Sequence, residues 1–144
     1  MQTFRFRLAK VLEWYTRQLE EEERRMAVCL AALAEAQQAI ARLQAERTAI
    51  ERDVVSRTSI PARDFVALGL YRLGAKKLEL ELNSARERCE AAVEEQQARL
   101  RAAERRVRLL EKLRQRRLAE HVYAENRELE ELASDAYFAK WASR

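Results

Sequence analysis

The chain has 144 residues and a net charge of +4, and Ala, Glu, Leu, Lys and Arg fill 93 of its positions, a composition typical of coiled coils and long helices. It contains only two glycines and one proline, so the turn residues of a multi-stranded or nucleotide-binding fold are missing, and such folds are excluded. With 36% charged residues, it favours a thin all-α structure with one narrow apolar seam.

The first predicted helix covers about residues 4–57. Its apolar residues recur at alternating spacings of four and three, which indicates a coiled-coil seam over about seven heptads. Glu22, Arg47 and Arg57 interrupt this seam, and polar residues at such positions usually fix the register of pairing. The predicted seam positions are Leu8, Leu12, Tyr15, Leu19, Glu22, Met26, Cys29, Leu33, Ala36, Ile40, Leu43, Arg47, Ile50, Val54 and Arg57.

A turn is predicted at about residues 58–62, where capping residues cluster around Pro61, with Ser59 as the expected N-cap. A second helix then covers about residues 63–139. Gly69 and Gly74 weaken its first turns, so this end is either loose or a separate short helix. Its many apolar residues favour a short extra helix that folds back over the turn, and the alternative is a docking groove edged by Tyr71, Leu78 and Leu82. The predicted seam of the second helix is Leu78, Leu82, Ala85, Cys89, Val93, Gln96, Leu100, Ala103, Val107 and Leu110.

Two helices joined by so short a turn should be antiparallel, with the numbers of facing residues adding to about 118. The predicted fold is therefore all-α: a long two-helix antiparallel coiled-coil hairpin with a C-terminal helical overhang, forming one domain over residues 1–144. Cys29 and Cys89 should lie at nearly one level, as reduced thiols that forcing oxidation would join.

The second helix is the longer one, so its residues beyond about 115 have no partner in the chain. They nevertheless carry apolar side chains, which implies a partner outside the chain. Deleting the residues after about 118 should leave the hairpin folded but abolish partner binding. The candidate residues of this surface are Leu118, Val122, Leu129, Leu132, Phe138 and Trp141.

Charge is unevenly distributed, because the open end of the hairpin is basic and residues 120–135 are acidic. An acidic protein surface is favoured as the target of the basic end, and a nucleic acid is the alternative. The N-terminal aromatic residues either staple onto the longer helix, which is favoured, or lie on a membrane surface. The residues of the basic end are Arg5, Arg7, Arg105, Arg106, Arg108, Arg116 and Arg117.

Chemistry by the chain itself is not expected. His121 is the only histidine and is predicted to be a solvated helix residue, and the sequence holds no phosphate loop or metal-ligand motif. The acidic runs 20–23 and 128–131 point to different helix faces, so no metal or other cofactor is expected. No secretion signal and no long apolar run is apparent, which predicts a cytoplasmic protein.

Residues 4–12 (FRFRLAKVL), the segment 113–117 (LRQRR) and residues 124–133 (AENRELEELA) resemble the opening and closing segments of the flagellar export protein FliJ family. The mid-chain break followed by Phe65, Leu68 and Tyr71 is similar to that family as well. The likeness extends over nearly the whole chain.

The resemblance implies a cytoplasmic component of the bacterial flagellar type III export apparatus, serving flagellum biogenesis and motility. Members of the family form a stalk-like coiled coil that inserts into the hexameric ring of the export ATPase FliI and contacts the export gate protein FlhA; some assist export chaperones. Such a protein is peripheral to the cytoplasmic face of the inner membrane, through its partners. By spacing, the gate-contacting face corresponds to Tyr71, Ala75, Leu78 and Leu82. A nucleic-acid-binding or self-associating structural coiled coil is the alternative function.

Overall fold

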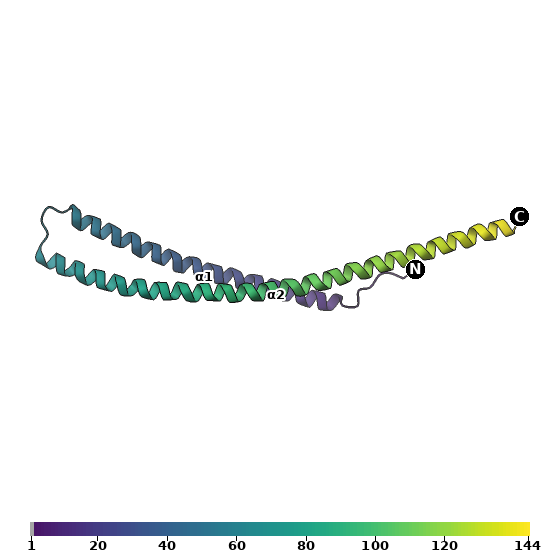
Figure 1. The fold of residues 1–144 in the computed structure, drawn as a ribbon, viewed down its shortest axis with the longest axis horizontal. Coiled ribbons are helices and arrows are strands. Elements are labelled where there is room, and N and C mark those ends of the chain that lie inside the picture. The colour runs from purple at the N-terminus through teal and green to yellow at the C-terminus, as the bar shows by residue number, and fades with distance from the viewer. Residues whose placement is uncertain (1) are drawn as a thin grey trace. The chain divides into compact units, whose positions relative to one another are not determined.

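The structure is a computed structural model that describes residues 2–144, and it consists of two long helices that pack against each other (Figure 1). Helix α1 is Ala9–Ser56, of 48 residues, and helix α2 is Ala62–Ala142, of 81 residues. No strand occurs among residues 2–144. The prediction of an all-α fold with two long helices is confirmed.

The first helix begins at Ala9 and not near residue 4, so the predicted start is wrong by about five residues. Phe4 and Phe6 are half-buried, whereas Arg5 and Arg7 are exposed. This alternation of period two belongs to an extended segment, because only there do successive side chains point to opposite sides. The other helix ends lie within three residues of the predicted ones.

The turn between the helices is held by Arg57. Its guanidinium group pairs with the Asp53 carboxylate in the last turn of α1, at 2.9 Å, and with the Asp64 carboxylate in the first turn of α2, at 3.2 Å. The Pro61 carbonyl accepts the backbone N–H groups of Asp64 and Phe65. Pro61 therefore precedes the helix in the N-cap position, and the prediction that Ser59 caps it is wrong.

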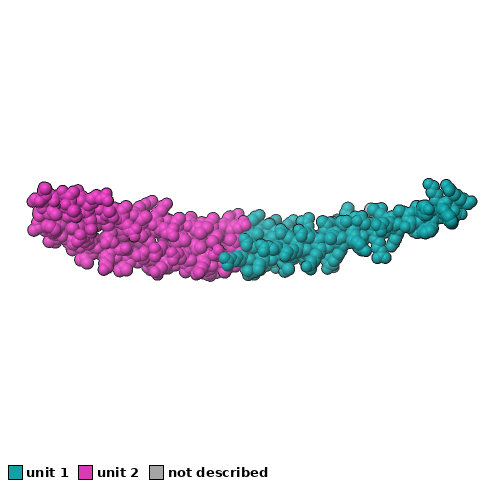
Figure 2. Space-filling model, turned by 45° about the horizontal axis from the view of Figure 1, so that its top comes forward, with its two compact units in different colours: residues 1–20, 101–144 teal, residues 21–100 magenta. Residues whose placement is uncertain are grey.

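Contacts divide the chain into two units, which are coloured separately in Figure 2. The hairpin unit is Glu21–Leu100, and the terminal unit joins the described residues up to Glu20 with Arg101–Arg144. Both helices run through both units, and each unit contains a stretch of α1 and a stretch of α2.

In the hairpin unit, every predicted seam position of α1 from Glu22 to Val54 is covered, and Ile40 and Leu43 are buried. Within this unit, residue numbers along α2 fall as those of the facing residues of α1 rise. Gln96 contacts Glu22, and their two residue numbers add to the predicted 118, whereas those of the pair Arg47 and Glu79 add to 126. A long Arg–Glu pair can reach about one helical turn along the axis, which accounts for part of this displacement.

The seam of α2 departs from the prediction close to the turn. Leu78 is 44% exposed, whereas Ala75 is buried and Glu79 is half-buried. Glu79 accepts a 2.8 Å hydrogen bond from Arg47, so an ion pair occupies the level at which an apolar contact of Leu78 was expected. From Leu82 to Leu100 the predicted seam positions are covered.

In the terminal unit, the beginning of α1 packs on α2 beyond Arg101. Ala103, Val107 and Leu110 are the buried core here, and Leu12 and Leu19 of α1 are half-buried. The three buried positions were all predicted as seam residues. Both cysteines are free and half-buried; Cys29 of the hairpin unit lines a shallow groove together with Gln96.

Helix α2 starts as one continuous helix, so the separate short helix that its glycines suggested is absent from the described residues. Neither glycine has a positive φ, and a Cβ atom added at Gly69 or Gly74 would meet no atom within 4 Å. Both positions thus carry only the entropic cost of glycine in a helix.

Gly69→Ala and Gly74→Ala are each expected to raise the free energy of unfolding by about 0.5–1 kcal/mol, because alanine reduces the freedom of the unfolded chain and adds no clash. Urea denaturation followed by far-UV circular dichroism measures this. Leu73→Ala, which changes an exposed position between the two glycines, is the comparison that should be nearly neutral. A loss of stability at either glycine would contradict the open surroundings found here.

Candidate partner-binding surfaces

The last part of α2 exposes large apolar side chains. The six residues that the sequence placed on a partner surface are between 44% and 71% exposed, and Figure 1 shows this end of α2 extending alone beyond the N-terminal segment. These residues are Leu118, Val122, Leu129, Leu132, Phe138 and Trp141. Tyr123 and Tyr137 are equally exposed and belong to the same stretch. We call residues 118–142 the overhang.

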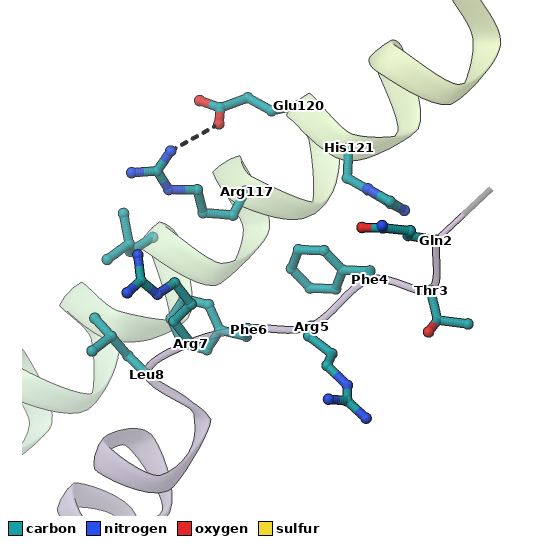
Figure 3. Close-up of a pocket in the computed structure, with 11 residues that line it drawn as sticks. Gln2, Thr3, Phe4, Arg5, Phe6, Arg7, Leu8, Arg117, Glu120 and His121 are labelled. Atoms are coloured by element: carbon teal, nitrogen blue, oxygen red, sulfur yellow. Dashed lines mark hydrogen bonds and ion pairs between the residues drawn. The ribbon is translucent and has the colours of Figure 1, made fainter. Parts of the chain in front are cut away.

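The N-terminal segment lies along α2 in the terminal unit (Figure 3). The ring of Phe4 points toward α2 and meets the imidazole of His121 at a centroid distance of 5.6 Å. The Nε2 atom of His121 lies 3.2 Å from the Glu125 carboxylate. His121 is therefore a half-buried contact residue of the helix, and the prediction that it is solvated is wrong. Phe4 thus contacts the longer helix, as expected of the staple that was favoured over a membrane contact.

An open groove of about 940 Å³ lies between this segment and α2, lined at the helix by Leu113, Arg117 and His121. Arg5 and Arg7 line its other side, and Figure 3 shows the Arg5 side chain turned away from the helix. Nearby α2 residues Arg105, Arg106, Arg108 and Arg116 are exposed. The predicted basic end is thus assembled within one unit from both parts of the chain.

Most of these charges have no counter-ion in the described part of the chain. Of the eight basic residues between Arg101 and Arg117, only Arg117 pairs with a carboxylate, that of Glu120 at 3.3 Å. The pair is well exposed and contributes little stability. An unneutralised basic surface of this kind attracts acidic partners of any class.

The residues matched to the gate-contacting face lie mainly between the helices. Ala75 is buried, Tyr71 and Leu82 are half-buried, and only Leu78 is largely exposed. A partner could therefore reach Leu78 directly, but it could reach the other three only along the edge of the hairpin. The large apolar residues that are most exposed at the start of α2 are others, namely Phe65, Val66, Leu70, Leu73 and Leu80.

The Tyr71 hydroxyl is enclosed and makes no hydrogen bond within residues 2–144. Loss of water around the hydroxyl raises the pKa of Tyr71 above its usual 10.0, and the nearby Glu46 carboxylate raises it further, against the opposing charge of Arg47. A raised pKa means that the folded state holds the phenol proton more tightly than the unfolded state does. The stability of the fold relative to its state with an ionised Tyr71 is therefore fully present below pH 10 and is lost as the pH rises through the folded-state pKa.

Tyr71→Phe is expected to leave the thermal midpoint at pH 7 unchanged or higher, because the phenylalanine ring keeps the packing and removes a hydroxyl without a partner. Above pH 10 the variant should lose less stability than the parent chain. Thermal scans at pH 7 and pH 10.5 provide the measurement, with Tyr137→Phe at an exposed site as the control. A clearly lower midpoint at pH 7 would show that the hydroxyl has a partner after all.

Helix α1 contains an 18-residue window with a mean hydropathy of 1.2 and no more than two charged residues, of which 11% is buried. Length and composition alone thus allow one membrane-spanning helix, but a core helix of a soluble protein meets the same criterion. Among residues 2–144, no group of three or more His, Cys, Asp or Glu side chains is placed to hold a metal ion.

Comparison with known proteins adds no relative: no protein-family model, curated protein or solved structure matches this chain.

Proposed function

We propose that the chain is a stalk-like component of the bacterial flagellar type III export apparatus, folded as an antiparallel coiled-coil hairpin with a C-terminal helical overhang. It binds the ring of the export ATPase FliI through the overhang and meets the export gate protein FlhA near the turn. It acts in the cytoplasm and reaches the inner membrane through these partners. It performs no chemistry of its own.

The observation that carries this proposal is the exposed apolar surface of the overhang. Six apolar side chains without cover favour a protein partner, because exposed patches of this kind mark binding sites more often than they are left in water. Helices of 48 and 81 residues with no internal proline supply the stiffness that a stalk inside a ring needs. The motifs similar to the FliJ family supply the identity of the ring, and they are sequence resemblance only.

The antiparallel arrangement is supported by the side-chain pairs of the hairpin unit. Partner numbers fall along α2 as they rise along α1, in the pairs formed by Glu22 with Gln96 and by Glu51 with Arg72. The buried and half-buried residues of α1 recur at spacings of three and four, which is the pattern of a coiled-coil seam.

The test is a binding experiment with the cognate export ATPase. The full chain should bind the assembled ATPase, be retained with it on a size-exclusion column, and raise its hydrolysis rate. A second arm measures binding to duplex DNA at 50 and 200 mM salt, because the unpaired arginines make nucleic acid the competing partner. Tight DNA binding with a steep salt dependence and no ATPase binding would reverse the assignment.

A further inference from the structure

Four of the exposed apolar residues of the overhang, Leu118, Val122, Leu129 and Leu132, lie on a heptad repeat, whereas Phe138 and Trp141 lie outside it. Beginning at Leu118, successive members of this repeat are four, three, four, three, four and three residues apart, which is the pattern of one helix of a coiled coil over three heptads. All members are exposed except Glu125, which is half-buried beside His121. The members of this overhang seam are Leu118, Val122, Glu125, Leu129, Leu132, Ala136 and Ala139.

The seam contains a single charged residue. Glu125 stands at a d position of the heptad, between the apolar levels of Val122 and Leu129. In a two-helix coiled coil, this carboxylate would be enclosed by the partner helix. A buried carboxylate is tolerated only when a donor or a positive charge faces it.

The residues beside the seam carry negative charge on one side only. The g positions hold His121, Glu128 and Asp135, whereas the e positions hold Ala119, Asn126, Ala133 and Lys140. Within residues 2–144, no basic group pairs with Glu128 or Asp135, although Glu131 is paired with Arg127. Both unpaired carboxylates border the surface that a partner helix would cover.

These charges disfavour a second copy of the chain as the partner. A parallel pair in register would set Glu125 against Glu125 of the second copy inside the seam, where two carboxylates repel strongly. An antiparallel pair would bring the two g sides together and set Glu128 and Asp135 against their own kind. Like charges in facing positions are a common device against self-pairing.

We infer that the overhang seam binds a helix of another protein that is apolar along its own seam, is basic along its flank, and places an arginine or lysine opposite Glu125. The inference rests on the proposed function, because it takes from it that the overhang is the surface that binds a partner. It adds the chemistry of the partner segment. The complex is a heterodimeric coiled coil about three heptads long, in which basic flank residues pair with Glu128 and Asp135.

The experiment uses the full chain and synthetic helical peptides of three heptads as probes. The first peptide has leucine along its seam, lysine at its flanks and one arginine at the level of Glu125. A second peptide has glutamate at the flanks, and a third has the composition of the first in scrambled order. Titration calorimetry should show binding of the first peptide at least tenfold tighter than binding of the other two.

Two matched double variants assign the charge preference. Glu128→Lys with Asp135→Lys should transfer the preference from the lysine-flanked to the glutamate-flanked peptide. Glu120→Lys with Glu130→Lys makes the same change of charge at exposed positions away from the seam, so the original preference should remain. Glu125→Leu should remove the advantage of the arginine in the first peptide.

Equal binding of the ordered and scrambled basic peptides would overturn the inference, since it would reduce the interaction to general charge attraction. So would a stable dimer of the chain alone in sedimentation equilibrium. Peptide binding that follows these rules without any binding of the export ATPase would leave the inference standing and reject the proposed function. If the Glu128→Lys, Asp135→Lys variant binds the ATPase as tightly as the parent chain, the inference is rejected and the proposed function stands.

Discussion

Gln96→Glu is expected to lower the free energy of unfolding by about 3 kcal/mol or more. Gln96 is the one buried polar residue of the hairpin unit, and its side-chain amide donates to the Glu22 backbone carbonyl at 3.2 Å and to the Glu22 carboxylate. The substitution removes both donated bonds and sets a second carboxylate against the first in a covered seam. A buried charge without a partner costs this much in other proteins.

Urea denaturation at neutral pH gives the change in free energy directly. The control is the exchanged pair, Glu22→Gln with Gln96→Glu, which restores one donor and one acceptor and should recover most of the loss. Glu95→Gln, beside Gln96 at an exposed position, should be nearly neutral. If Gln96→Glu unfolds at the same urea concentration as the parent chain, the contact between Gln96 and Glu22 does not fix the pairing of the helices.

This pair also indicates how far sequence reasoning reaches. The spacing of apolar residues identified the covered face of α1 because a narrow seam leaves only one face to bury. It identified Glu22 as an interruption and placed Gln96 in the seam of the second helix, and their numbers agree with the predicted register. What spacing could not show is that the two polar residues satisfy each other, because that depends on the register of both helices at once.

The predictions that were wrong concern positions at which individual side-chain contacts, and not the spacing of apolar residues, determine the structure. Leu78 fits the heptad pattern but is exposed, because the ion pair of Arg47 and Glu79 takes its level. The contact of His121 with Phe4 was missed because it joins a segment outside the helices to one helix face. The alternation of Phe and Arg at residues 4–7 was a signal for that extended segment, and it was assigned to the helix instead.

Deleting residues 126–144 is expected to abolish binding to the export ATPase while leaving the stability of the hairpin unchanged. Every residue from Asn126 onward is exposed, so the deletion removes no covered surface from the rest of the chain. It retains His121 and Glu125, and with them the contact of the N-terminal segment. A longer deletion of residues 118–144 also removes that contact and should loosen the segment without unfolding the hairpin unit.

Four measurements separate a binding effect from a folding effect. The urea midpoint of the shorter chain should match that of the parent chain within error, whereas its affinity for the ATPase should fall at least a hundredfold. Leu129→Asp with Leu132→Asp in the full chain should reproduce the loss, because it places charges in the overhang seam without shortening the helix. The matched substitution Tyr123→Asp with Tyr137→Asp, on exposed residues outside that seam, should weaken binding less. A truncated chain that still stimulated the ATPase fully would place the binding surface elsewhere. The next candidate would then be the open groove between the N-terminal segment and α2 in the terminal unit.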